Sequence, residues 1–204
     1  PWWGKPRTPD VAWVPGIDRP GAATGLQHAM ANSLDRFTDR FGHTLPLEPQ
    51  DWLRSFVPML GDWRSDLMNR PLTIAHADYR LANLMFGPDG EVTILDWQTA
   101  MYSGGPADLA FLLATNLDPA VRHSHEDELV DLRVATLRSK GVEPDAVTHI
   151  RDDYEHAPLW CMGMLANNLS SIETPDERSA ALFDAMLTRL YAAAIDGDCG
   201  RFVS

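Results

Sequence analysis

Three short β-prone runs near the middle of this 204-residue chain restrict its fold more than any other feature. The runs are Leu72–Ala75, Leu84–Phe86 and Val92–Leu95, and the turn sequence Gly87–Gly90 separates the last two. Glycine, proline and aspartate between two β-prone runs predict a tight hairpin. Because helical periodicity dominates on both sides, the runs predict a small β element within a mainly helical α+β fold.

Apolar residues recur at helical spacing through most of the remaining chain. The segments Leu26–Phe41 and Glu48–Met68 precede the β element, and Pro58 predicts a kink or a division within the second segment. After the β element, the residues from Asp108 onward predict the next helix. Four further helices are expected, over Glu126–Arg138, Asp145–Tyr154, Leu159–Leu169 and Glu177–Ile195.

Length and composition predict a single domain. With 45% apolar residues, a chain of 204 residues can bury one sizeable core. We expect an irregular, proline-rich lead-in at 1–23, a helical region at 24–70, the β element with its loop at 71–100, and a second helical region at 101–204. No internal repeat or low-complexity segment interrupts this organisation.

Acidic residues outnumber basic ones by 29 to 17, which gives a formal net charge of −12. Nucleic-acid binding requires clustered basic surface, so neither DNA nor RNA is an expected partner. A membrane partner is not expected either, because no apolar run reaches the roughly 18 residues that span a bilayer. An acidic chain suits a cationic or metal-bridged small ligand.

The chain carries few signs of secretion. Cys161 and Cys199 are its only cysteines, and a domain of this size needs no disulfide framework. We therefore expect two free thiols and a cytoplasmic location. The chain begins Pro1-Trp2-Trp3, with neither an initiator methionine nor a signal-peptide pattern, so we expect it to be the interior of a longer polypeptide.

A group of polar residues lies in the loop between the first two β-prone runs. The loop contains His76, Asp78 and Asn83, and Asp96 directly follows the third run. One carboxylate can orient or deprotonate an attacking hydroxyl, whereas another carboxylate and a neutral amide oxygen can hold Mg²⁺ on nucleotide phosphates. The pattern therefore predicts a site for phosphoryl transfer.

This pattern resembles the protein-kinase-like phosphotransferases. The sequences H-A-D-Y-R-L-A-N-L-M-F and I-L-D-W-Q are similar to their small-molecule branch, which includes aminoglycoside phosphotransferases, choline kinases and ecdysteroid-kinase-like proteins. The segment Tyr102–Ala110 resembles the G-x-P-x-x-D-L-A sequence of that branch, so the motif covers residues 72–113. The resemblance implies the C-terminal lobe of a protein-kinase-like fold, in which the short β element carries the catalytic loop.

The resemblance also implies roles for individual residues. Asp78 matches the catalytic base, and Asn83 and Asp96 match the two Mg²⁺ ligands. His76 matches the residue whose ring helps to fix the loop and the metal-binding aspartate.

Two further residues belong to the motif. Arg80 stands where its guanidinium would contact the transferring phosphoryl group or form a structural ion pair. Asp108 is expected to be structural, as the N-cap of a helix and a brace for the catalytic loop. The plainer alternative is that Asp78 and Asn83 merely cap turns.

The implied reaction moves the γ-phosphoryl group of ATP or GTP to a hydroxyl of a small molecule. We expect the acceptor to lie against the later helices, where Asp152, Asp153 and Glu155 supply negative charge and Trp160 supplies an apolar surface. The acidic residues suit a cationic acceptor such as an aminosugar or choline. The resemblance to ecdysteroid-kinase-like proteins instead suggests a more apolar alcohol.

Kinase-like enzymes bind the nucleotide with a smaller N-terminal lobe that has a glycine-rich loop and a strand lysine. The only lysines here, Lys5 and Lys140, lie among prolines and after a helix, and no G-x-G-x-x-G is present. We therefore expect that lobe to lie outside this chain and the fragment alone to be inactive. Two alternatives are a catalytically silent kinase-like ligand-binding module and, less expected, a metal-dependent phosphohydrolase that uses His76, Asp78 and Asp96.

Overall fold

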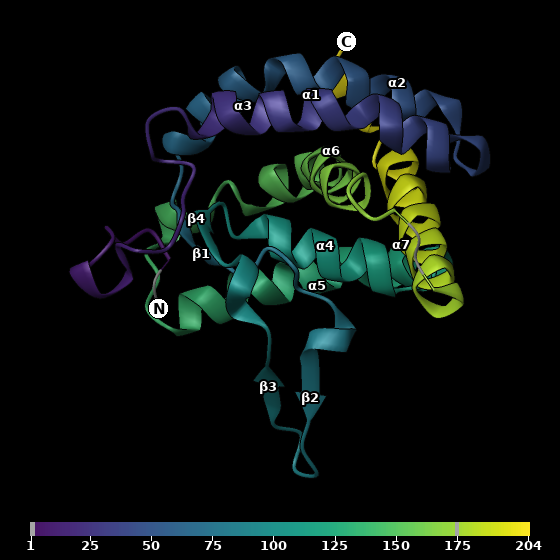
Figure 1. The fold of residues 1–204 in the computed structure, drawn as a ribbon. Helices are drawn as coiled ribbons and strands as arrows, with labels where there is room; N and C mark the ends of the chain where they lie inside the picture. The colour runs from purple at the N-terminus through teal and green to yellow at the C-terminus, as the bar shows by residue number, and fades with distance from the viewer. Residues whose placement is uncertain (1–2, 174–175) are drawn as a thin grey trace.

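The computed structural model describes residues 3–173 and 176–204 as a mainly helical α+β fold, which confirms the expected fold class (Figure 1). Residues 1 and 2 of the expected lead-in lie outside the described residues. The described helices are α1 (Ala22–Phe41), α2 (Leu47–Phe56), α3 (Leu60–Met68), α4 (Pro106–Asn116), α5 (Pro119–Ser139), α6 (Ile150–Leu169) and α7 (Glu177–Asp196). The strands are β1 (Thr73–Ala75), β2 (Leu84–Phe86), β3 (Val92–Ile94) and β4 (Met101–Ser103).

The strands form two separate antiparallel pairs rather than one compact element. β1 pairs with β4, with Thr73 opposite Ser103, and β2 pairs with β3, with Leu84 opposite Ile94. β4 was not predicted, because a three-residue strand directly before two glycines shows no readable periodicity. The lead-in covers the free edge of β4: the Tyr102 amide donates to the Pro15 carbonyl at 2.7 Å, and the Ile17 amide donates to the Tyr102 carbonyl at 3.1 Å.

Two expected interruptions of helices have different outcomes. At Pro58 the prediction of a division is confirmed, since α2 ends at Phe56 and a 3₁₀ turn separates it from α3. The predicted break between Tyr154 and Leu159 is wrong, because α6 continues through Pro158. An interior proline removes one helical hydrogen bond. Most of the residues of α6 from Ala157 onward are buried, so packing outweighs that loss.

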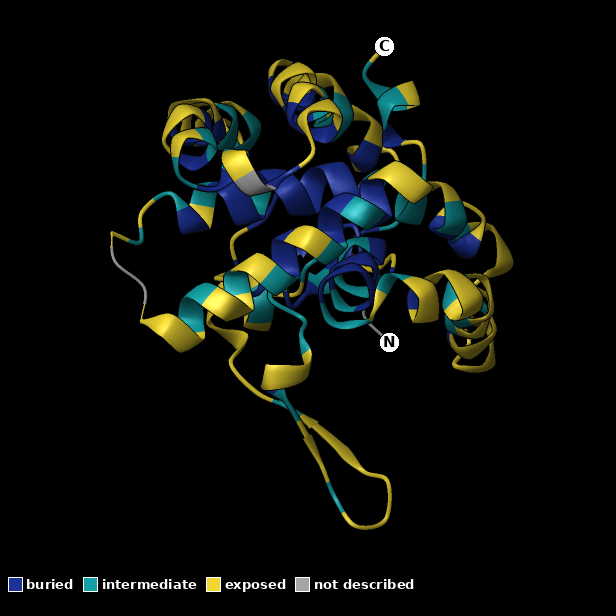
Figure 2. Cartoon of the chain, turned by 90° about the vertical axis from the view of Figure 1, so that its right-hand side faces the viewer, coloured by how far each residue is buried: buried dark blue, intermediate teal, exposed yellow. Residues whose placement is uncertain are grey.

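Helix α6 lies at the centre of the molecule. Figure 1 shows it between the layer formed by α1, α2 and α3 and the layer formed by α4 and α5, and Figure 2 shows that the interior helical turns are buried. Gly163 allows α1 to approach α6, since a Cβ at this position would lie 2.9 Å from the Met30 sulfur. Within the described ranges, no helix combines the length and the hydropathy that a membrane crossing requires.

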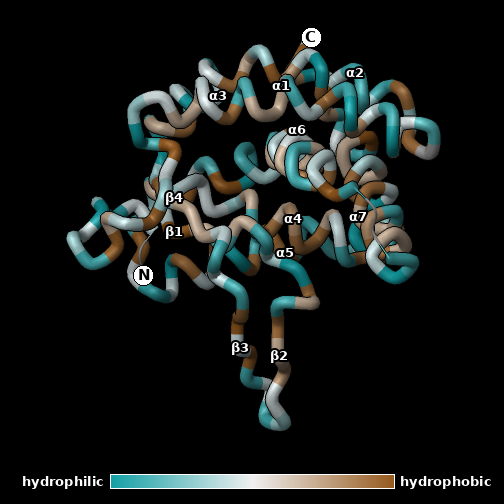
Figure 3. The backbone as a smooth tube through the Cα atoms, in the orientation of Figure 1, coloured by the Kyte–Doolittle hydropathy of each residue, from teal (hydrophilic) through white to brown (hydrophobic). Residues whose placement is uncertain are grey.

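The β2–β3 hairpin extends away from the helical body (Figures 1 and 2). Hydrophobic residues nevertheless lie along it, as Figure 3 shows. Met85, Phe86 and Val92 have exposed fractions of 60%, 66% and 48%. Adjacent large apolar side chains on a projecting hairpin are typical of a surface that another part of a protein covers.

Gly105 allows Trp3 to pack against the start of α4. A Cβ at Gly105 would lie 2.2 Å from the Trp3 ring and 2.9 Å from the Thr73 side chain. We therefore expect Gly105→Ala to lower the free energy of unfolding by about 1–3 kcal/mol, which urea denaturation would measure. Gly61→Ala in α3 is the matched control, because a Cβ there meets nothing within 4 Å and should stabilise the helix. Equal stability of the two variants would contradict this account.

Candidate active site

The predicted catalytic loop begins directly after β1, and Asp108 holds its first turn. The Asp108 carboxylate accepts hydrogen bonds from the His76 amide at 2.6 Å and from the Ala77 amide at 2.8 Å. These bonds fix Ala77 at a φ of 64°, in a region that non-glycine residues rarely adopt. Desolvation raises the pKa of Asp108 above its ordinary value, although both backbone hydrogen bonds act in the opposite direction.

Asp108 does not occupy the N-cap of α4. The N-cap is Gly105, and Asp108 lies in the first turn of the helix. The N-cap part of the expectation is therefore wrong. The two hydrogen bonds to His76 and Ala77 are the contacts that a brace of the loop requires.

His76 connects the loop to the segment that carries Asp96. The imidazole is 2% exposed, and its Nδ1 accepts a hydrogen bond from the Asp78 amide at 3.3 Å. Its Nε2 therefore carries the proton and donates to the Leu95 carbonyl at 2.8 Å. The Trp97 ring packs against the imidazole, with centroids 4.8 Å apart. His76 thus positions both the predicted base and the residue before the predicted metal ligand.

One oxygen of Asp78 is held by its neighbours in the loop. Asp78 Oδ2 accepts hydrogen bonds from Arg80 Nε at 3.1 Å and from Asn83 Nδ2 at 2.9 Å. Asn83 Nδ2 also donates to the Asp78 carbonyl at 2.9 Å. No described residue hydrogen-bonds Asp78 Oδ1. The contacts fix the carboxylate and leave one oxygen for another group.

Asp96 and Asn83 lie on adjacent segments, because the Leu95 amide donates to the Asn83 carbonyl at 2.8 Å. Asp96 is exposed and adopts a left-handed conformation, with φ 61° and ψ 58°. Because Asn83 Nδ2 bonds to Asp78, the amide oxygen of Asn83 stays available to a cation. An amide oxygen and one carboxylate fit Mg²⁺, which commonly completes its coordination with phosphate oxygens and water.

A metal site built only from acidic, histidine or cysteine side chains is not found in the described part of the chain. Among the described residues, no three histidine, cysteine, aspartate or glutamate side chains cluster as metal ligands.

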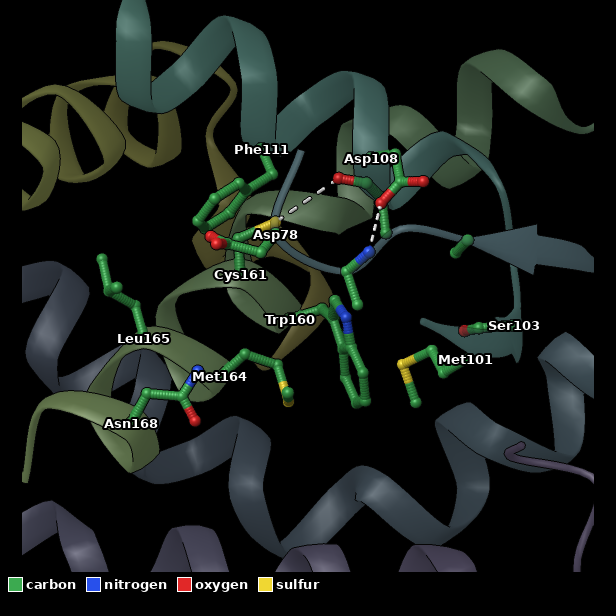
Figure 4. A pocket seen from close by; sticks show the side chains of 13 residues that line it. Asp78, Met101, Ser103, Asp108, Phe111, Trp160, Cys161, Met164, Leu165 and Asn168 are labelled. Atoms are coloured by element: carbon green, nitrogen blue, oxygen red, sulfur yellow. Dashed lines mark hydrogen bonds between the residues drawn. The ribbon is translucent and has the colours of Figure 1, made fainter. Parts of the chain in front are cut away.

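Asp78 lines a cavity of about 50 Å³ whose other walls are mainly apolar (Figure 4). Met101 of β4, Phe111 of α4 and Trp160 of α6 form these walls. Trp160 stacks on Trp63, with ring centroids 4.7 Å apart. Met101 and Trp160 also line a second, almost wholly apolar cavity of about 160 Å³, so the two cavities adjoin.

The buried cysteines are not candidates for nucleophiles. Cys161 and Cys199 are free thiols, as expected, and Cys161 lines the Asp78 cavity. Burial raises the pKa of the Cys161 thiol far above its usual range and that of Cys199 to about 12. Both sulfurs therefore stay protonated near neutral pH, where only a thiolate would react readily.

Of the residues predicted to contact the acceptor, the structure brings only Trp160 to the Asp78 cavity. Asp152 is exposed on α6, and Asp153 forms an ion pair with Arg70. Glu155 forms an ion pair with Arg201 at 2.5 Å and borders a different cavity. The expected acidic surface for the acceptor is therefore absent from the described lining of this cavity.

Sequence reasoning missed other lining residues. Met101 and Ser103 belong to the unpredicted strand β4, so no role could be assigned to them. Asn168 was also missed, although a usable signal exists. Trp160, Met164 and Asn168 follow one another at four-residue intervals, which places them on one face of α6.

A mainly helical fold with this motif between short strands defines the class as protein-kinase-like phosphotransferases of small molecules. The sequence profile of the Ecdysteroid kinase-like family matches residues 26–140, from α1 through α5. The chain belongs to this family. A search of curated proteins and a search of solved structures found no match.

Proposed function

We propose that this chain forms the catalytic loop and acceptor-binding part of an ATP- or GTP-dependent small-molecule kinase. Family membership supports kinase-like phosphoryl transfer to a small molecule. The observation that carries the proposal is the position of Asp78. Its carboxylate is held through one oxygen by Arg80 and Asn83, and it borders an apolar cavity.

In the proposed reaction, Asp78 orients an acceptor hydroxyl and accepts its proton through Oδ1. The Arg80 guanidinium fixes Asp78 through Nε and has further N–H groups for phosphoryl oxygens. Asn83 and Asp96 would hold Mg²⁺. When bound, the magnesium nucleotide supplies the phosphoryl group and neutralises its charge. Asp108 and His76 act indirectly, because they keep the loop and the Asp96 segment in place.

The lining of the two adjoining cavities favours an uncharged, apolar alcohol as the acceptor. Met101 and Trp160 line both cavities, and Leu26 and Leu60 extend the apolar surface of the second. The two acids in the described lining, Asp78 and Asp108, already accept hydrogen bonds from groups of the loop. The charge of a cationic aminosugar or choline would therefore lie against mainly apolar walls without the expected acids of α6, which is costly.

We assign this activity to the complete gene product. The four described strands carry no lysine and no glycine-rich loop. The exposed apolar residues Met85, Phe86 and Val92 suit a surface that a separate nucleotide-binding lobe covers. A fragment without that lobe would be inactive. The buried free thiols agree with a cytoplasmic location, which is part of the same proposal.

The proposal is tested by phosphoryl transfer from Mg²⁺-ATP to a panel of alcohols, followed by phosphorus NMR. We expect uncharged cyclic alcohols to be better acceptors than aminosugars or choline, and chelation of Mg²⁺ to stop transfer. Asp96→Ala should remove nearly all turnover, because it removes the only predicted carboxylate ligand. Glu91→Ala is the matched control, since Glu91 is an exposed acid on the β2–β3 hairpin that precedes Asp96.

Three outcomes would contradict the proposal. Wild-type turnover in Asp96→Ala would show that Asp96 does not hold the metal. Thermal stabilisation by an alcohol without nucleotide-dependent turnover would indicate a silent ligand-binding module. Release of phosphate from a phosphate ester without nucleotide would indicate a phosphohydrolase.

A further inference from the structure

A separate cavity of about 530 Å³ lies next to the catalytic loop, and none of its lining residues lines the Asp78 cavity. Its walls come from the lead-in, from β1, from the turn after Asp96 and from α5. Its volume lies within the range of roughly 300–1,000 Å³ that is typical of small-molecule sites. The two cavities near Asp78 are smaller, at about 50 and 160 Å³.

Three tryptophans contribute to the walls of this cavity. The indole N–H groups of Trp3, Trp13 and Trp97 donate to the carbonyls of Ala146, Asp10 and Ile94, at 2.8, 2.9 and 3.1 Å. The polar atom of each ring is thus satisfied by the protein itself. Trp13 and Trp97 nevertheless have exposed fractions of 71% and 46%. A flat or ring-shaped apolar ligand would cover this aromatic surface.

Arg133 of α5 is the one charged side chain among the described residues that line the cavity. It is half-buried, and its guanidinium lies 5.5 Å from the centroid of the Trp3 ring. In the described part of the chain, no acidic side chain forms an ion pair with it. The nearby acids of α5, Asp127 and Asp131, are paired with Arg151 instead. The cavity therefore has a positive charge that no ion pair among the described residues neutralises, in a chain of net charge −12.

We propose that this cavity binds a small ring-containing carboxylate, with the ring against the tryptophans and the carboxylate on Arg133. An apolar ring matches the aromatic walls. A carboxylate matches the planar donor geometry of a guanidinium, and Arg133 forms no ion pair with a described residue. This proposal stands independently of the proposed kinase activity.

A ligand in this cavity would contact elements that position the catalytic loop. Trp97 directly follows Asp96 and packs against His76. Thr73 and Ile74 belong to β1, which leads into the loop. The positive charge of Arg133 also lowers the pKa of Asp108, so an anion beside Arg133 would weaken that influence.

The proposal is tested by isothermal titration calorimetry of the complete gene product with naphthoate and with its uncharged analogue naphthamide. We expect naphthoate to bind at least about tenfold more tightly, because a hydrogen bond from a guanidinium to a carboxylate is stronger than one to a neutral amide. Arg133→Gln should remove this preference. Arg138→Gln is the matched control, because Arg138 is exposed on the same helix and does not line the cavity.

A second variant keeps the test valid if Arg133→Gln does not fold. Trp13→Ala removes an exposed ring and should weaken binding of both probes, whereas Leu132→Ala, at another exposed apolar side chain, should not. Absence of naphthoate binding at millimolar concentration would overturn the proposal. Equal binding of naphthoate and naphthamide would overturn the role of Arg133. Equal losses of naphthoate affinity in Arg133→Gln and Arg138→Gln would overturn it as well.

Discussion

Asp78→Asn is expected to lower the rate of phosphoryl transfer by about 10²- to 10⁴-fold, which is the usual contribution of a general base. Asparagine keeps the size of the side chain and an oxygen that can accept from Arg80 Nε and Asn83 Nδ2. It cannot take a proton from the acceptor hydroxyl. The loss should therefore appear mainly in kcat rather than in KM for the acceptor.

The control for this variant is Asp89→Asn, which makes the same change at an exposed acid in the hairpin turn. Kinetics should be near wild type for the control. Thermal unfolding should show that Asp78→Asn folds, since the lost ion pair with Arg80 is partly exposed and contributes about 1 kcal/mol or less. Wild-type kcat in Asp78→Asn would mean that another group orients the hydroxyl.

The parts of the fold that could be predicted are those in which a local signal agrees with the tertiary environment. Pro58 lies between two amphipathic helices, and the chain forms a 3₁₀ turn there that divides them. Pro158 has the same local signal, yet α6 continues, because this helix forms the centre of the core. Burial of a complete helix is a non-local effect, and a single sequence does not report it.

The candidate site likewise has parts that a local signal predicts and parts that it does not. His76, Asp78, Asn83 and Asp96 could be singled out because they lie within a short motif, and their hydrogen bonds are local or pass through adjacent segments. The Asp78 cavity could not be predicted, since it is formed where β4, α4 and α6 meet. The acidic residues of α6 illustrate the difficulty: Asp153 is close in sequence to Trp160, yet it pairs with Arg70.

Asp108→Ala is expected to lower the free energy of unfolding by about 2–4 kcal/mol. The substitution removes the acceptor for two backbone amides, His76 and Ala77, and an unsatisfied amide costs about 1–3 kcal/mol when it is buried. Such a loss is large against the 5–15 kcal/mol that usually separates folded from unfolded states. Urea denaturation at neutral pH measures it. Asp108→Asn should lower the free energy of unfolding by less, because its amide oxygen can still accept from one of the two N–H groups.

The dependence of this loss on pH gives an independent check. The pKa of Asp108 in the folded state is raised above its ordinary value of 3.8. Below pH 3.8 the protonated carboxyl therefore stabilises the folded state. This stabilisation is lost as the pH rises through the folded-state pKa. The deficit of Asp108→Ala should therefore shrink as the pH rises through this window. Asp176→Ala is the control of opposite sign, because hydrogen bonds from Ser179 lower the pKa of Asp176. Its deficit should grow as the pH rises toward 3.8, and a common pH dependence in the two variants would contradict the desolvation of Asp108.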